Sequence, residues 1–221
     1  VDNAGVTSPS PTVKVVAGPP VSITRWAGQN QVVAAGSAAP IAPAVFLKDA
    51  KNNPVPGVAV TFSISGGNGQ VTGAVAVTDT QGVATVGAWI VGTVAGVVNN
   101  LLAVGGGFSV EFAASVVAGP ASPLTSVMTI DRDSVEVAHN AKVTLFTRDA
   151  YGNDLTNGGA TVTFYYEGGT SVGTFLATAD KGDGRYEVQF TGQTAGTAIQ
   201  IRAVLNGALV TTPPPSIRVW Q

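Results

Sequence analysis

The chain has 221 residues, of which 45 % are hydrophobic and only 11 % are charged, with a formal net charge of −2 and no cysteine. Soluble proteins are about 25 % charged, so this composition provides no basic surface for nucleic acid, and it is too apolar for a disordered chain. Without cysteine, disulfides, thiolate metal ligands and thiol catalysis are excluded. The 28 glycines and 13 prolines are typical of short β-strands joined by turns.

Two stretches of sequence return about a hundred residues later. Residues 45–50, Val-Phe-Leu-Lys-Asp-Ala, return at 145–150 as Leu-Phe-Thr-Arg-Asp-Ala, and Val-Val-Ala-Gly-Pro occurs unchanged at 15–19 and 116–120. A period of this length fits a whole small domain. We therefore expect an all-β chain of two tandem β-sandwich domains joined by a short Pro/Gly linker. The expected parts are an extended segment at 1–17, a first domain at 18–118 and a second domain at 119–221.

Short alternating apolar runs bounded by Gly, Asn, Asp and Pro predict about eight strands in each repeat, enough for one Greek-key sandwich. In the first repeat the expected strands are 20–26, 31–35, 44–49, 58–64, 70–78, 83–91, 97–104 and 108–114. In the second repeat they are 126–131, 134–137, 141–149, 160–167, 173–179, 184–191, 198–205 and 216–220. The stiff, extended prolines at 213–215 are expected to deliver the last strand to a sheet edge.

Three motifs of the first repeat resemble bacterial immunoglobulin-like domains of the invasin and intimin type. They are Lys-Asp-Ala-Lys-Asn-Asn-Pro-Val-Pro-Gly-Val-Ala-Val-Thr-Phe at 48–62, Thr-Asp-Thr-Gln-Gly-Val-Ala-Thr at 78–85, and Ala-Gly at 95–96. In the second repeat Asp-Ala-Tyr-Gly-Asn at 149–153 also fits, whereas 180–188 is more similar to filamin-type repeats. The resemblance implies immunoglobulin-like sandwiches that serve as a spacer, stalk or adhesive module on a bacterial cell surface, with a host or cell-surface ligand.

The residues that could carry chemistry do not form a recognisable active site. His139 is the only histidine and lies in an expected turn, and no nucleophile motif is present, so we expect no catalytic residue, no enzyme activity and no cofactor. Three acidic pairs raise a calcium hypothesis: Asp131 with Asp133, Asp149 with Asp154, and Asp180 with Asp183. Arg132, Arg148 and Lys181 stand among them, which favours turn-capping aspartates and no metal site.

The aromatic residues allow an alternative function. Trp26, Trp89, Trp220 and the pair Tyr165-Tyr166 could form a stacking platform for sugars, as in an accessory carbohydrate-binding module of a secreted enzyme. These residues are scattered over both repeats, which favours packing in cores or interfaces. Glycan binding that is lost on W89A or Y166A would favour the alternative.

The repeat boundaries suggest that the repeating unit continues beyond this chain. The linker sequence at 15–19 precedes the first domain, and 216–221 aligns with 109–114, where the chain stops without a linker. Residues 1–120 carry eight charges that sum to zero, which favours a surface covered by other copies or domains. No stretch is apolar enough to span a bilayer.

Two explanations remain open. The chain is either a part of a longer array with flanking immunoglobulin-like domains, or a subunit of a pilus-like, head-to-tail extracellular filament built by β-strand complementation. The expected interaction residues are Thr12, Val13, Lys14, Val15 and Val16 as a donated strand, and Ile217, Val219 and Trp220 on a C-terminal edge strand.

Overall fold

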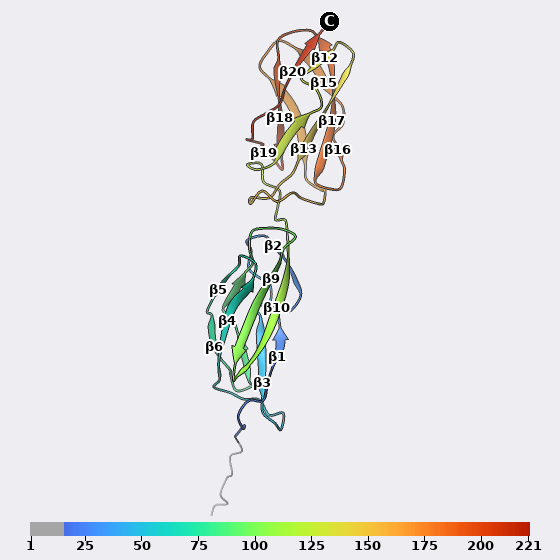
Figure 1. Ribbon diagram of the computed structural model, residues 1–221. Coiled ribbons are helices and arrows are strands. Elements are labelled where there is room, and N and C mark those ends of the chain that lie inside the picture. The colour runs from blue at the N-terminus through green and yellow to red at the C-terminus, as the bar shows by residue number, and fades with distance from the viewer. Residues whose placement is uncertain (1–15) are drawn as a thin grey trace, which may run out of the picture.

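The computed structural model describes residues 16–221, which form two β-sandwiches stacked end to end in an elongated molecule (Figure 1). The chain passes from the first domain to the second through a short linker at 118–121. The described residues are strands and connections, and none of them belongs to a helix that is long and apolar enough to cross a membrane. The all-β architecture of two tandem sandwiches is therefore confirmed.

The first domain is built from ten strands. They are β1 (Ser22–Ala27), β2 (Gln31–Ala34), β3 (Ala44–Lys48), β4 (Ala59–Gly66), β5 (Gln70–Thr72), β6 (Val75–Val77), β7 (Val83–Thr85), β8 (Ala88–Ile90), β9 (Val98–Gly105) and β10 (Phe108–Val117). One sheet has the order β1-β3-β7 and the other β2-β10-β9-β4-β6, while β5 and β8 pair separately. The two larger sheets enclose the core.

The core of the first domain follows from alternation along the strands. In β4, Val60 and Phe62 are buried whereas Thr61 and Ser63 are exposed, because successive side chains of a strand point to opposite faces. The largest buried side chains are Trp89, Phe62, Phe112, Leu47 and Leu101. Burial of each large apolar side chain contributes about 1.5–3 kcal/mol.

The second domain repeats this plan. Its strands are β11 (Val127–Ile130), β12 (Ser134–Glu136), β13 (Asn140–Phe146), β14 (Val162–Glu167), β15 (Val172–Phe175), β16 (Ala179–Asp180), β17 (Arg185–Thr194), β18 (Ile199–Leu205), β19 (Ala208–Leu209) and β20 (Ser216–Trp220). One sheet has the order β11-β13-β17-β15 with β16 beside β17, and the other β12-β20-β18-β14 with β19 beside β18. Tyr186, Phe190 and Leu145 lie in the core between them.

Two strands expected in the first domain are each divided. The expected strand 70–78 is β5 and β6, and the expected strand 83–91 is β7 and β8. Gly73 separates the first pair with a φ of 58°, a conformation that glycine adopts without steric cost. A Cβ at Gly87, between the second pair, would lie 2.7 Å from the Thr72 carbonyl oxygen. The backbone bends at both glycines, so that β5 and β8 pair with each other outside the two larger sheets.

The expectation that the last strand is a sheet edge is wrong, because β20 lies between β12 and β18. Val219 pairs with Val135 in the same parallel arrangement in which Val116 pairs with Val33 in the first domain. Val219 therefore corresponds to Val116, an offset of 103 in place of the 107 that the sequence alignment of the last strand gave. Trp220 accordingly takes the place of Val117 in the linker sequence.

Candidate functional site: the interdomain joint

The turn after β13, which meets the linker, contains a carboxylate that accepts hydrogen bonds from four donors. Asp149 is 1 % exposed. Its Oδ1 accepts hydrogen bonds from the backbone N–H groups of Tyr151 and Asn153, both at 2.9 Å. Its Oδ2 accepts from the Gly119 N–H of the linker at 2.9 Å and from Nδ2 of Asn153 at 2.8 Å. The carboxylate thus holds its own turn and the incoming linker together.

The charge state of Asp149 follows from these bonds. Burial tends to raise the pKa of the carboxyl group, but the hydrogen bonds from the Asn153 side chain and from the Gly119, Asn153 and Tyr151 amides outweigh burial and lower the pKa below its usual value. Asp149 is therefore a carboxylate at neutral pH. Hydrogen bonds to a charged acceptor are the stronger kind, so the linker is firmly held to the second domain.

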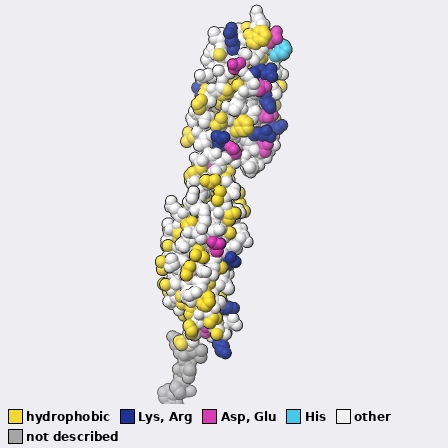
Figure 2. Space-filling view, viewed as in Figure 1, with side chains coloured by type: hydrophobic (Ala, Val, Ile, Leu, Met, Phe, Trp, Pro, Cys, Tyr) yellow, Lys and Arg dark blue, Asp and Glu magenta, His cyan; other side chains and the backbone are white. Residues whose placement is uncertain are grey.

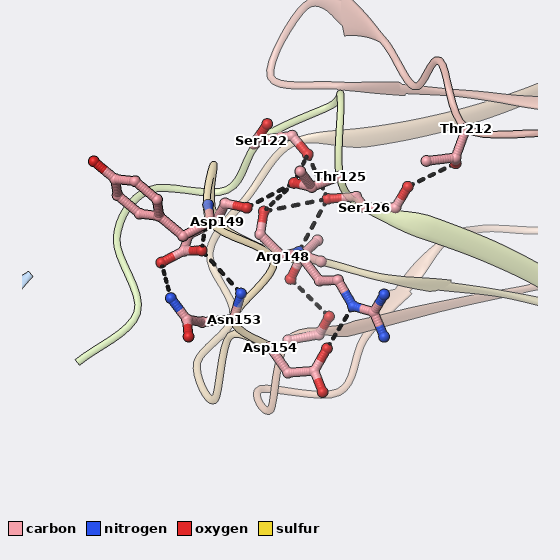
Figure 3. A network of polar contacts seen from close by, with 11 residues as sticks. Ser122, Thr125, Ser126, Arg148, Asp149, Asn153, Asp154 and Thr212 are labelled. Carbon is pink, nitrogen blue, oxygen red and sulfur yellow. Dashed lines mark hydrogen bonds and ion pairs between the residues drawn. The ribbon is translucent and has the colours of Figure 1, made fainter. Parts of the chain in front are cut away.

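Asn153 connects the second domain to the first. Its Nδ2 donates to the carbonyl oxygen of Thr93 at 2.8 Å, and its Oδ1 accepts from the N–H of Ala95 at 2.9 Å. Thr93 and Ala95 belong to the loop between β8 and β9, at the end of the first domain. The same amide also donates to Asp149 (Figure 3). One side chain therefore joins the loop, the turn and, through the carboxylate, the linker.

A second contact lies beside this one. The Tyr151 hydroxyl lies so close to Gly36 that a Cβ on Gly36 would overlap it. Gly36 has a φ of 69°, and its N–H donates to the Gly92 carbonyl oxygen at 3.0 Å. The close approach of the ring requires a residue without a side chain at this position.

Hydroxyl groups fix the segment that follows the linker. Ser122 N–H donates to the Arg148 carbonyl oxygen at 2.7 Å. Ser126 Oγ donates to the Ser122 carbonyl oxygen at 2.7 Å and accepts from Arg148 N–H at 3.0 Å, while Thr125 Oγ1 donates to the Asp149 carbonyl oxygen at 2.6 Å (Figure 3). The chain entering the second domain is therefore bonded to Arg148 and Asp149, the residues with which the turn begins.

The first domain carries the same turn after β3, where it meets the segment that leads into that domain. Asp49 Oδ1 accepts from the N–H groups of Lys51 at 2.8 Å and Asn53 at 2.9 Å. Its Oδ2 accepts from Gly18 N–H at 2.9 Å and from Asn53 Nδ2 at 3.0 Å. The Asn53 side chain and the Gly18 amide are the main causes that lower the pKa of Asp49. The repeated sequence therefore encodes the same arrangement in both domains, in which an Asp carboxylate and an Asn side chain four residues later hold the incoming linker; we call this arrangement the clasp.

The acidic pairs of the calcium hypothesis are bonded to protein donors. Asp131 accepts from Lys142 N–H at 2.9 Å, Asp154 pairs with Arg148 at 2.7 Å, Asp180 accepts from two turn amides at 2.7 and 2.8 Å, and Asp183 pairs with Arg185 at 2.6 Å. Within residues 16–221, three or more His, Cys, Asp or Glu side chains do not gather in any one place. The geometry gives the calcium hypothesis no support.

The aromatic residues do not converge on one platform. Trp89 is fully buried, and Tyr166 packs edge-on against Phe190 in the second core, with ring centroids 6.0 Å apart. Trp26 and Trp220 are exposed on different domains. The single histidine, His139, is exposed in the turn after β12, as its sequence context predicted.

The expected interaction residues have different environments. Ile217 and Val219 are completely buried in the core of the second domain, so the structure contradicts their expected place on an open edge, whereas Trp220 is exposed. Val16 is exposed, and Thr12, Val13, Lys14 and Val15 lie outside the described residues. Sequence reasoning missed Asn153 as a bridging residue, although the recurrence of Asp and Asn at 49 and 53 and at 149 and 153 was the available signal.

The two halves of the chain match two family models. Residues 23–116 match the bacterial Ig-like domain (group 1), and residues 122–219 match invasin, domain 3. The chain is a tandem of bacterial immunoglobulin-like domains of the invasin and intimin type. The resemblance of the first repeat is thereby confirmed, and the second repeat, in which residues 180–188 resemble filamin-type repeats, matches a domain of invasin. A search of curated proteins finds no match.

Several solved structures are similar to this tandem. FdeC, an Escherichia coli adhesin, is 25 % identical with a TM-score of 0.58, over 93 % of this chain and 66 % of that one. Invasin, a bacterial integrin-binding protein, is 22 % identical with a TM-score of 0.46, over 90 % and 39 %. Yersinia pseudotuberculosis InvD is 21 % identical with a TM-score of 0.49, over 85 % and 54 %. The chain spans less than two thirds of each of these solved chains.

Proposed function

We propose that this chain is a non-catalytic, extracellular module of a bacterial surface protein, in which two immunoglobulin-like domains form a spacer that carries adhesive contacts away from the cell. The observation that carries the proposal is the interdomain joint, where Asn153 bonds both Thr93 and Ala95 across a short linker. A spacer needs a fixed angle between its domains. The similarity to FdeC, described as an adhesin, supports the adhesive part.

The surface of the two domains also fits this role. Charged side chains are sparse on the first domain and gather on the second (Figure 2). Exposed valines lie on the first domain, namely Val32, Val75, Val77, Val98 and Val104. A weakly charged, apolar surface suits contact with a host or cell-surface ligand or with neighbouring molecules more than it suits an isolated soluble domain.

The experiment combines shape with adhesion. Small-angle X-ray scattering of the purified chain should give the maximum dimension of two domains stacked end to end, and beads coated with the chain should bind host cells or extracellular matrix above beads coated with an unrelated sandwich. A compact, folded-over scattering profile would refute the spacer. Normal elongation without binding to any surface tested would restrict the role to that of a stalk.

Self-assembly into a filament is the narrower form of the proposal. The segment Thr12 to Val16 alternates as a donated strand should, but β20 already has a neighbour on each side, so the acceptor edge must be another strand. Negative-stain microscopy should show fibres that disappear when residues 1–17 are deleted. Monodisperse particles from the full chain would refute the filament, and fibres that survive the deletion would refute strand donation.

A further inference from the structure

The Asp49 turn, which follows β3, presents hydrogen-bonding groups that have no partner within residues 16–221. Asn53 makes the same bond to Asp49 that Asn153 makes to Asp149. In contrast to Asn153, it is exposed, and within residues 16–221 its Oδ1 and its second Nδ2 hydrogen have no hydrogen-bonding partner. These are the two groups with which Asn153 holds Thr93 and Ala95.

The far end of the second domain presents the matching surface. Its β17–β18 loop corresponds to the β8–β9 loop of the first domain at an offset of 100. Gly196 N–H donates to the Val219 carbonyl oxygen, just as Gly96 N–H donates to that of Val116, so both loops are held in the same way. Ala195 N–H, the counterpart of the Ala95 donor, has no backbone or side-chain acceptor within the part of the chain that the structure describes.

We propose that the Asp49 turn is one half of a second interdomain joint, in which Asn53 bonds the Ala195-type loop of an immunoglobulin-like domain that directly precedes it in the same polypeptide. The inference rests on the proposed function, because it needs an array. The bond from Asn53 to this loop is then the contact that joins the first domain to the domain before it.

A covalently linked partner fits better than a separate copy. Two hydrogen bonds over a small area cannot offset the entropy lost when two free molecules associate, whereas a short covalent linker supplies a high effective concentration. The segment that leads into the first domain is also already held in the required position. Gly18 N–H donates to Asp49 at 2.9 Å, the same distance at which Gly119 N–H donates to Asp149.

The observed joint and the proposed joint differ in the side chains beside the Asn contact, and this difference determines which domain can pack against which. In the observed joint, Tyr151 needs the bare backbone of Gly36. At the far end of the second domain, Ala138 occupies the place of Gly36, with a φ of 66° and the same bond from its N–H, here to the Gly192 carbonyl oxygen. The first domain carries Lys51 in place of Tyr151, so it can dock against an alanine without a ring to clash.

The test uses two copies of the chain fused so that Trp220 of the first is followed by Ala17 of the second. This fusion keeps the observed linker length, because Trp220 corresponds to Val117. Hydrogen exchange at Ala195 of the first copy is followed by NMR with segmental labelling. We expect exchange about 30-fold slower than in the single chain, the effect of two net hydrogen bonds, and a return to the single-chain rate with N53A in the second copy.

Two further variants test whether the slow exchange at Ala195 comes from the proposed joint. K51Y in the second copy leaves every Asp49 bond intact and should also abolish the protection, because the ring meets Ala138. N153A should leave Ala195 protected while it exposes Ala95. Equal exchange at Ala195 in the fusion and the single chain would overturn the inference, as would equal protection in concentrated, unfused chains. If Ala195 is unprotected while the single chain remains an elongated rod in scattering, only the inference fails and the spacer function stands.

Discussion

Replacement of Asn153 by alanine should loosen the joint without unfolding either domain. The substitution removes two cross-domain hydrogen bonds, at 2.8 Å to Thr93 and 2.9 Å from Ala95, together with one bond inside the turn to Asp149. A net value of about 1 kcal/mol for each neutral bond gives about 2 kcal/mol across the domains, or about 30-fold in the population of the open joint.

The matched control is N53A, because Asn53 makes the turn bond to Asp49 but no cross-domain bond to the described chain. The assay is amide hydrogen exchange at Ala95, which reports opening of the joint directly. N153A should accelerate this exchange about 30-fold, and N53A should leave it unchanged. An unchanged rate in N153A, or an equal acceleration in both variants, would refute the idea that the Asn153 amide holds the domains together.

Three further predictions concern the joint and the core. G36A should accelerate hydrogen exchange at Ala95 roughly tenfold, because the added methyl group overpacks against Tyr151. Adding Y151A to G36A should restore the slow exchange, since Ala138 shows that the corresponding loop of the second domain tolerates a methyl group at a positive φ. Exchange that stays fast in the double variant would mean that G36A distorts its own loop. Folding lowers the pKa of Asp149, so its carboxylate stabilises the second domain fully above the pKa of the unfolded state, about 3.9, and this stabilisation is lost as the pH falls through the lower pKa of the folded state. The melting temperature of D149N should therefore depend less on pH between 5 and 2 than that of the unsubstituted chain. An unchanged pH dependence would contradict this. W89A should cost the first domain about 3–5 kcal/mol and leave the second calorimetric transition in place; a shift of both transitions would mean that the domains unfold together.

The sequence predicts the strands well where side chains alternate and poorly where the backbone turns within an apolar run. The core face of β4 follows from period two alone, with Val60 and Phe62 inside. Gly73 divides one expected strand through its positive φ, and Gly87 divides the other where a Cβ would meet the Thr72 carbonyl oxygen. The sequence does not indicate that β5 and β8 pair with each other. Neighbours across a sheet are non-local, so the prolines at 213–215 indicate an extended last strand but do not reveal its place between β12 and β18.

The joint could be predicted only in part. The repeated Asp and Asn, four residues apart, mark a turn that binds its own amides, and the repeated Gly of the linker is one of its donors. That Asn153 also reaches Ala95, 58 residues away, depends on the linker length and on the angle between the domains. These are properties of the folded tandem that no local pattern contains.

The hydrogen bonds and the side-chain packing of the joint come from different residues, which explains how the same clasp can join different domains. Asp149 and Asn153 bond almost entirely to backbone groups, those of Gly119, Tyr151, Thr93 and Ala95. Backbone donors and acceptors are present whatever the sequence, so the geometry of the clasp persists while the surrounding side chains change. The side chain of Tyr151, which contacts Gly36 without taking part in the clasp, is therefore free to vary and can set which domain follows which. An array built in this way keeps a constant angle at each joint and encodes the order of its domains in one pair of positions.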